Sequence, residues 1–284
     1  MTRGAEVFRT LQSKARSAAG TTGKPAPTQE YLIRHLLESF LDRLVRSGHG
    51  QDFVLKGGIL LAAYGVRRPT KDADANAINA DVTPEHLVRV VTHIAKLPCD
   101  DGVAFDTDSI TVQEIREHVG YPGYRVRVKA SIGPWNGTSA WDVSTGDPII
   151  PAPRLVSIDR VLGAPLQLLG YAAETTIAEK AVTILERGIT STRWRDYVDI
   201  VQLCSQGFSP CELRRSAEAV ARYRGVTLEP VSPHLKGYGT IGQPKWAAWR
   251  RKERLEDICE AQLDDQVALV AHFIDPVFTS APQE

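Results

Sequence analysis

The chain has 284 residues, 43% of them apolar and 24% charged, which is ordinary for a globular protein and enough for one large domain or two smaller ones. The 34 lysines and arginines balance 34 aspartates and glutamates, so the overall charge does not indicate nucleic-acid binding. Only a local basic patch could bind nucleic acid. Four scattered cysteines without a C-x-x-C pair, and no apolar run near the roughly 20 residues of a membrane span, predict a reduced cytoplasmic protein without structural zinc.

The N-terminal part of the chain predicts a flexible segment followed by a helix. Residues 1–27 are polar, end in AAGTTGKPAPT and lack the apolar core of a secretory signal, so we expect a flexible lead-in. In residues 28–47 the apolar side chains recur at helical spacing, and Thr28 is placed to cap the N-terminus. We therefore expect an amphipathic helix that ends before Gly48.

A glycine pair and two closely spaced aspartates follow within one short stretch, LKGGILLAAYGVRRPTKDADANA (residues 55–77). The apolar run DFVL leads into Gly57 and Gly58, which predicts a short strand or turn and then a short helix. KDADANAI predicts a second strand, in which Asp72 and Asp74 point to the same face because side chains alternate. Its alanines are weak strand formers, so we expect this strand to be poorly packed.

The sequence pattern changes near residue 150. A helix capped by Thr83 and three further strands are expected before that point. The predicted strands span residues 104–115, 123–133 and 138–147. Beyond PIIPAPR the periodicity becomes helical and continues to about residue 274. We therefore expect three parts: the lead-in, an α/β or α+β core at 28–150 and a mainly helical part at 151–284.

Three aspartates offer the chemistry of a metal site. Asp72 and Asp74 lie on one predicted strand and Asp142 lies on another. Like charges held close together repel unless a cation lies between them, and carboxylate oxygens are preferred ligands of Mg²⁺. Two such ions about 4 Å apart would clamp the attacking and leaving oxygens of a phosphoryl transfer. The D-x-D spacing is common by chance, so spacing alone favours a solvated pair of loop acids over a metal site.

Several stretches share their order and spacing with one protein family. They are FVLKGGILLAAYGVRRPTKDADANA, YPGYRVRVKASIG with AWDVSTGDPIIPAP, ETTIAEKAVTILERGITSTRWRDYVDI, and ARYRGVTLEP with the tryptophans near 246–249. Together they resemble the AbiEii/MenT family of nucleotidyltransferase-like toxins from bacterial toxin–antitoxin systems. In that family FVLKGG-x-LL leads to R-x-T-x-D-x-D, and a helix lysine precedes an arginine–aspartate pair. This chain departs from the family where alanines replace bulky apolar residues around the D-x-D.

The resemblance implies a fold and a set of site residues. The implied fold is α+β, with a nucleotidyltransferase-like mixed sheet flanked by helices and followed by a mainly helical C-terminal half. The implied catalytic residues are Asp72, Asp74, Asp142, Lys180 and Asp196, of which the first three would bind Mg²⁺ or Mn²⁺. The implied nucleotide-binding residues are Lys56, Gly57, Gly58, Arg68, Thr70 and Lys180. Taken without the resemblance, Lys180 and Asp196 fit exposed residues on helix faces.

The resemblance also implies a reaction. A nucleoside monophosphate would pass from an NTP to an acceptor with release of pyrophosphate. The implied acceptor is the 3′ end of tRNA, whose modification would block translation, and the implied partner is a cognate antitoxin. Two alternatives stay open, because a fold does not fix an acceptor. The acceptor could be a protein or an aminoglycoside-like small molecule, or the chain could bind nucleotide or antitoxin without catalysis.

Two further features, a glycine-rich stretch and several basic clusters, resemble binding motifs but also fit ordinary structural roles. GYGTIG at 237–242 matches G-x-G-x-x-G, but prolines flank it and no strand precedes it, so we expect a flexible loop and no dinucleotide site. Basic clusters occur on predicted helices and fit either solvated faces or contacts to RNA phosphates, which salt would weaken. These clusters are Arg214/Arg215, Arg222/Arg224 and Arg250–Arg254.

Overall fold

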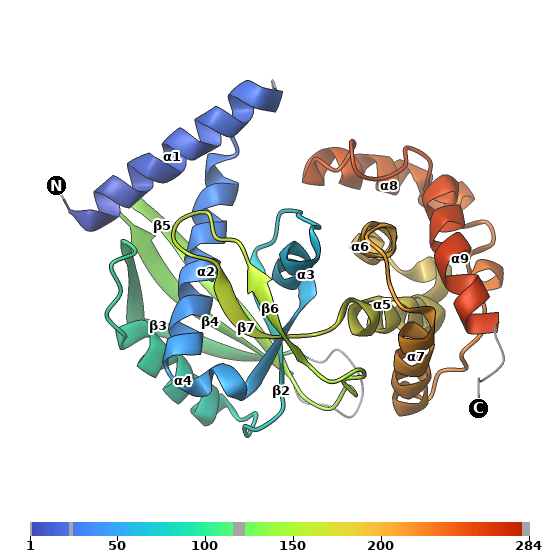
Figure 1. The fold of residues 1–284 in the computed structure, drawn as a ribbon. Coiled ribbons are helices and arrows are strands. Elements are labelled where there is room, and N and C mark those ends of the chain that lie inside the picture. The colour runs from blue at the N-terminus through green and yellow to red at the C-terminus, as the bar shows by residue number, and fades with distance from the viewer. Residues whose placement is uncertain (1, 23–24, 116–122, 280–284) are drawn as a thin grey trace. The chain divides into compact units, whose positions relative to one another are not determined.

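The computed structural model describes residues 2–22, 25–115 and 123–279, and the chain divides into two compact units (Figure 1). We call them the sheet unit and the helical unit. The sheet unit comprises Met1–Ala63, Pro69–Gly146 and Leu155–Gly170. The helical unit comprises Tyr64–Arg68, Asp147–Arg154 and Tyr171–Glu284. The segments of the two units therefore alternate along the chain, which a single boundary near residue 150 does not describe.

The described strands form one mixed sheet of seven in the order β3-β4-β5-β2-β1-β7-β6. They are β1 (Phe53–Lys56), β2 (Asp72–Ala77), β3 (Val103–Ile115), β4 (Gly123–Ile132), β5 (Trp135–Ser144), β6 (Arg154–Ile158) and β7 (Leu166–Gly170). β1 runs antiparallel to β2 and parallel to β7, and β2 runs parallel to β5. The expected α+β class is confirmed. β6 and β7 were not predicted, because five residues each are too few to establish a period of two within an apolar stretch.

The N-terminal segment is a helix, so the expectation of a flexible lead-in is wrong for its described residues. The helices of the sheet unit are α1 (Arg3–Thr22), α2 (Thr28–Arg46), α3 (Gly57–Leu60) and α4 (Pro84–Lys96). Val7, Leu11 and Ala15 recur every four residues on α1 and are buried. Val7 and Leu11 belong to a core shared with α2 and β4, beside which α1 lies in Figure 1. Met1 and residues 23–24 of the lead-in lie outside the described residues.

The helical unit contains five α-helices in the described part of the chain. They are α5 (Ala173–Arg187), α6 (Trp194–Ser205), α7 (Pro210–Arg224), α8 (Tyr238–Glu253) and α9 (Leu263–Thr279). The GYGTIG stretch opens α8, so its expected assignment as a flexible loop is wrong. Gly239 donates its backbone N–H to Asp264 Oδ1 at 2.8 Å, and a Cβ atom there would overlap that carboxylate. The glycine therefore serves a close approach between α8 and α9.

Strand β2 is well packed, in contrast to the expectation from its alanines. Ala73 and Ala75 are buried on the face that carries Trp141, and Ala73 lies directly opposite Trp141 on β5. The indole ring contacts Phe53 and Phe40 at centroid distances of 4.7 and 5.6 Å. Small side chains on β2 leave the room that this large ring fills, so the two strands complement each other in volume.

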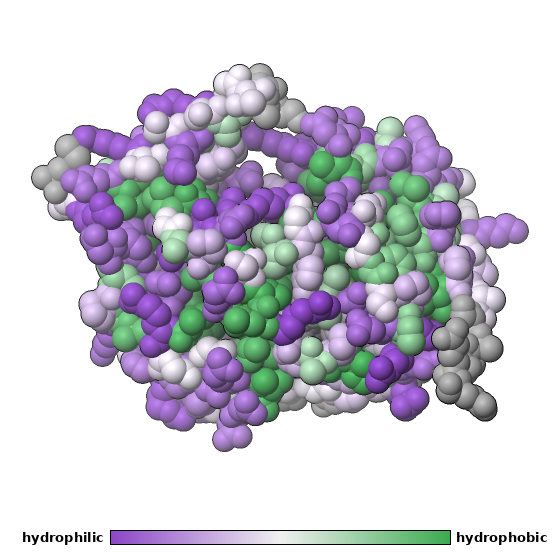
Figure 2. Space-filling view, in the orientation of Figure 1, coloured by the Kyte–Doolittle hydropathy of each residue, from purple (hydrophilic) through white to green (hydrophobic). Residues whose placement is uncertain are grey.

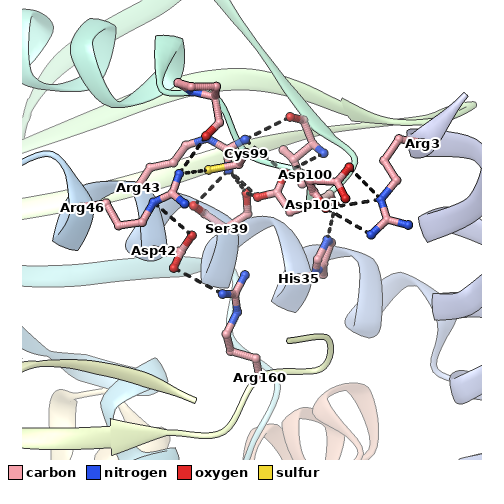
Figure 3. Close-up of polar contacts among 12 residues, drawn as sticks. Arg3, His35, Ser39, Asp42, Arg43, Arg46, Cys99, Asp100, Asp101 and Arg160 are labelled. Atoms are coloured by element: carbon pink, nitrogen blue, oxygen red, sulfur yellow. Dashed lines mark hydrogen bonds and ion pairs between the residues drawn. The ribbon is translucent and has the colours of Figure 1, made fainter. Parts of the chain in front are cut away.

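A buried polar network ties α2 to the segment that leads into β3 (Figure 3). Arg43 donates to Asp101 Oδ1 at 3.1 Å and to the Val103 carbonyl at 3.2 Å. Ser39 donates to the same aspartate, and His35 Nε2 lies 2.9 Å from its backbone carbonyl. Each of these α2 side chains is almost fully buried, so the network fixes the edge strand β3 to the helix layer.

The surface in view mixes hydrophilic and apolar residues (Figure 2). Among the described residues the exposed large apolar side chains are Ile78, Val88, Leu155 and Ile241. They come from four separate places in the sequence, and single exposed apolar residues are normal for folded proteins. Within the described residues, no helix has the length and apolar character needed to cross a membrane.

Candidate active site

Asp74 and Asp142 lie directly opposite each other on the neighbouring strands β2 and β5. Lys56 on β1 is the register partner of Asp74, and Arg125 on β4 is the partner of Asp142. Side chains in register on adjacent strands point to the same face, so a Lys–Asp–Asp–Arg row crosses four strands. Asp72 shares this face because it lies two residues before Asp74. We call these five residues the charged row.

The charged row occupies the face of β2 that the alanines do not use. The alternate residue Ala75 lines a small cavity with Leu41 and Leu44 of α2, so the alanine face packs against that helix. The aspartates therefore project to the other side of the sheet. Asp142 is 7% exposed, whereas Asp72 and Asp74 are half-buried. Asp72 and Asp74 are therefore accessible in part to solvent, whereas Asp142 is enclosed.

Arg125 holds two of the three aspartates. Its Nε donates to Asp142 Oδ1 at 2.6 Å and one terminal nitrogen donates to Asp142 Oδ2, which makes a bidentate pair. The same terminal nitrogen lies 3.5 Å from Asp72 Oδ2. The hydrogen bonds to Asp142 are the main reason why the pKa of Arg125 is raised above its ordinary value. No feature of the sequence alone singled out this arginine.

Gly57 lies against the third aspartate. Its φ of +68° is in the left-handed region, and a Cβ atom on it would lie only 1.9 Å from Asp74 Oδ2. Gly57 opens the four-residue helix α3, and Gly58 is buried in the same turn. Thr70 donates its hydroxyl to the Asp72 carbonyl at 3.3 Å. The structure thus places Lys56, both glycines and Thr70 beside the aspartates with which the sequence had grouped them.

The chemistry of the donor set fits a divalent cation, although the side chains are not arranged as a finished metal site. Three carboxylates on one face supply the hard oxygen ligands that Mg²⁺ and Mn²⁺ prefer. A positive guanidinium already bridges Asp142 and Asp72, as a cation would. Within the described ranges no group of three or more His, Cys, Asp and Glu side chains lies close enough together to hold a metal ion.

A second cluster of charges lies inside the helical unit. Lys180 of α5 contacts Asp196 Oδ1 at 2.6 Å and Asp199 Oδ2 at 2.9 Å, both on α6. Arg68 forms a bidentate pair with Asp199 at 2.7 and 3.0 Å. Arg193 donates to Asp196 at 2.7 Å. Both aspartates are almost fully buried, so they are not exposed helix-face acids, and Lys180 is not a solvated lysine.

The buried charges of this second cluster favour one another's ionised forms. Burial alone would lower the pKa of Lys180, but Asp196 and Asp199 together raise it above its ordinary value. Burial opposes ionisation of the two aspartates as well. Lys180 and Arg193 nevertheless hold the pKa of Asp196 below its ordinary value, and Lys180 and Arg68 do the same for Asp199. The lysine therefore stays cationic within a fixed hydrogen-bond geometry.

The structure separates the predicted residues into two groups and adds residues that were missed. The sheet unit holds Asp72, Asp74, Asp142, Lys56, Gly57, Gly58 and Thr70, and the helical unit holds Lys180, Asp196 and Arg68. The missed residues are Arg125 and Asp199. The alternation in YRVRVKA placed Arg125 on a strand face, and the i, i+3 spacing placed Asp199 beside Asp196. Neither pattern shows which residue of a neighbouring strand or helix faces Arg125 or Asp199.

The fold uses several arginines of the basic clusters. The Arg224 side chain is 6% exposed and pairs with Asp147. Arg214 donates to the carbonyls of Val277 and Phe278, and Arg250 donates to those of Glu256 and Cys259. These three arginines stabilise loops and helix ends, which reduces the set that could contact RNA phosphates.

Comparison with known proteins adds to this geometry. The family model described as nucleotidyl transferase AbiEii toxin, type IV TA system, matches residues 39–268. The structure is similar to that of JHP933 from Helicobacter pylori, with 15% identity, a TM-score of 0.50, and coverage of 88% of this chain and 92% of that one. A candidate nucleotidyltransferase from H. pylori matches at 16% identity and a TM-score of 0.47, covering 88% of this chain and 95% of that one. No curated protein matches.

Proposed function

Because the chain belongs to the AbiEii family of nucleotidyl transferase toxins, we propose that it transfers a nucleoside monophosphate from an NTP to the 3′ acceptor end of tRNA. Pyrophosphate would leave, and the modified tRNA would no longer serve translation. A cognate antitoxin would be its partner, and the cytoplasm its location. The observation that carries the proposal is the in-register pair of Asp74 and Asp142. Asp72 lies on the same face, and the Gly57 backbone lies against Asp74.

The proposal assigns a divalent cation to the charged row. Asp72, Asp74 and Asp142 would hold Mg²⁺ or Mn²⁺, which when bound neutralises charge on the transferring phosphate. Asp142 would also accept the proton of the attacking acceptor hydroxyl. The absence of a side chain at Gly57 lets the Asp74 carboxylate lie against the backbone of the glycine turn, which would bind the triphosphate.

Lys180 would supply positive charge to the phosphates. Its ammonium is held by two buried carboxylates, so its position within the helical unit is fixed, and preorganised charge stabilises a transition state without reorganisation. In this proposal Asp196 and Asp199 orient Lys180. Arg68, which the family resemblance assigns to nucleotide binding, also steadies Asp199 through its bidentate pair.

The test is a labelling experiment with matched variants. Each of the four NTPs, labelled at the α-phosphate, is incubated with total tRNA, total protein and a small-molecule pool in the presence of Mg²⁺. We expect label in tRNA for the unaltered protein, none for Asp74→Asn, and normal labelling for Asp108→Asn, an exposed acid on β3 of the same sheet. Sequencing of RNA 3′ ends after expression in cells would show the added nucleotide.

The outcomes separate the proposal from its alternatives. Label in the protein or small-molecule pool but not in tRNA would keep the chemistry and change the acceptor. Cell toxicity that persists in Asp74→Asn, with no label in any pool, would show that the protein acts by binding. Loss of labelling in EDTA and recovery with Mn²⁺ would establish the metal requirement.

A further inference from the structure

Arg125 is bound to the residues that the proposed function assigns to a cation. It comes from β4, two strands away from β2, and it reaches Asp142 with two hydrogen bonds and Asp72 at 3.5 Å. Its side chain is 30% exposed, so solvent and space adjoin it on one side. The guanidinium therefore lies between two carboxylates from different strands, and both attract its positive charge.

A guanidinium in a bidentate pair takes one lone pair on each oxygen of a carboxylate, and its positive charge repels a metal ion that approaches the same group. The bidentate contact to Arg125 uses both oxygens of Asp142. Inner-sphere binding of Mg²⁺ or Mn²⁺ requires lone pairs of those oxygens at about 2.0–2.2 Å, with near-octahedral geometry for Mg²⁺. A guanidinium does not lose its proton in proteins, so it can vacate the site only by moving.

The neighbouring arginine provides an internal comparison. Arg127 lies two residues further along β4, on the same face, and its register partner on β5 is Ala140. It donates to Gln113 on β3 at 3.1 Å. Two arginines of one strand face therefore have different partners, and the difference follows from which β5 residue lies opposite each of them.

We propose that Arg125 is the resident counter-ion of the charged row, with which a divalent cation must compete for Asp142 and Asp72. This inference rests on the proposed function for the assignment of a metal to these aspartates. Arg125 is in this sense a positioning residue: it neutralises and orients the carboxylates while no metal is bound and lowers their affinity for free metal. Its release on metal entry provides a positive charge next to the site at the moment when phosphates are bound there.

The test measures Mn²⁺ binding to the full-length protein without nucleotide, by the electron paramagnetic resonance signal of free Mn²⁺. Arg125→Gln removes a charge-assisted bidentate pair, so we expect its Kd for Mn²⁺ to fall about tenfold. Arg127→Gln is the matched control, and its Kd should stay within about twofold of the unaltered protein. Asp142→Asn should abolish the binding, which assigns the measured site. An unchanged or raised Kd in Arg125→Gln would overturn the proposal.

Arg125→Lys keeps the positive charge but cannot form the bidentate pair. We expect its Kd for Mn²⁺ to lie between those of the unaltered protein and Arg125→Gln. If Arg125→Gln does not fold, Arg125→Lys provides the test of the proposal. An unchanged Kd for Mn²⁺ in Arg125→Lys would then overturn the proposal. Labelling of tRNA is measured separately. Tighter Mn²⁺ binding in Arg125→Gln with no labelling by the unaltered protein would refute the proposed function alone, whereas labelling with an unchanged Kd would refute the role of Arg125 alone.

Discussion

Gly57 and Asp74 are in such close contact that no side chain fits between them. A Cβ atom on Gly57 would lie 1.9 Å from the Asp74 carboxylate, and its φ of +68° is already costly for any other residue. The glycine that opens α3 therefore determines how closely the chain passes over the aspartate. In the proposed reaction, that contact also sets the position of a carboxylate that would bind the cation.

The first prediction concerns this contact. Gly57→Ala should displace Asp74 and lower nucleotide transfer about 100-fold, which is the scale of loss that a misplacement of about 1 Å can produce. Gly48→Ala is the control, because Gly48 also has a positive φ but a Cβ atom on it would have no neighbour within 4 Å. It should lose roughly 1–2 kcal/mol of unfolding free energy and keep its activity. Equal activity in the two variants would contradict the role of the contact.

A second prediction concerns the buried ion pairs of the helical unit. Lys180→Met leaves Asp196 and Asp199 without their shared cation, and removal of one partner from buried charges costs about 3–5 kcal/mol of unfolding free energy. Arg193→Met is the comparison, because Arg193 contacts Asp196 but its side chain is 47% exposed. That variant should lose only about 0–1 kcal/mol. Chemical denaturation of both variants measures the difference, and similar losses would argue against a buried cluster.

The same cluster predicts how stability depends on pH. The pKa values of Asp196 and Asp199 lie below their ordinary value of 3.8, so their stabilising contribution is complete above that pH and is lost as the pH falls through the lower folded values. The pKa of Lys180 lies above its ordinary 10.5, so its contribution is complete below 10.5 and is lost as the pH rises through the higher folded value.

Denaturation at a series of pH values tests this expectation. The free energy of unfolding should fall less steeply in acid for Asp199→Asn than for the unaltered protein, because one depressed carboxylate has been removed. Asp265→Asn, an exposed acid at the start of α9, should keep the original slope. An acid slope that is the same in all three proteins would show that the buried pair does not govern acid unfolding.

The last prediction concerns the alanines of β2. Ala73→Leu inserts a larger side chain opposite Trp141 and should cost about 1–3 kcal/mol of unfolding free energy by overpacking. Combination with Trp141→Leu should recover part of that loss, because the second change returns volume to the same site. Ala104→Leu on the exposed face of β3 should change stability by less than about 0.5 kcal/mol. Strict additivity of the first two changes would contradict complementary packing.

Local pattern was enough to predict some of this structure. The alternation of side chains in KDADANAI placed Asp72 and Asp74 on one face, and β2 confirms that arrangement. It could not predict that Asp142 lies opposite Asp74, since register depends on which strands become neighbours. The pairing of Arg125 with Asp142 is a contact of the same non-local kind, and it changes the expectation of a ready metal site.

Burial shows the same limit in the helical unit. The spacing of Asp196 and Asp199 put both on one face of α6, but a helix face is polar or buried according to what packs on it. Here α5 brings Lys180 to that face, and the short segment containing Arg68 brings a second cation. The α1 helix was missed for a related reason, because the residues that it buries, Val7, Leu11 and Ala15, form a narrow stripe in a segment of polar composition.

The alternating division of the chain has a consequence for any attempt to split this protein. Leu55 of β1 pairs with Gly170 of β7, so a fragment that stops at residue 150 lacks one neighbour of a central strand. A fragment that starts there lacks Arg68, the partner of Asp199. No single cut yields two intact halves. Fragment complementation, separate expression of the units and insertion of a reporter near residue 150 should therefore all compromise folding.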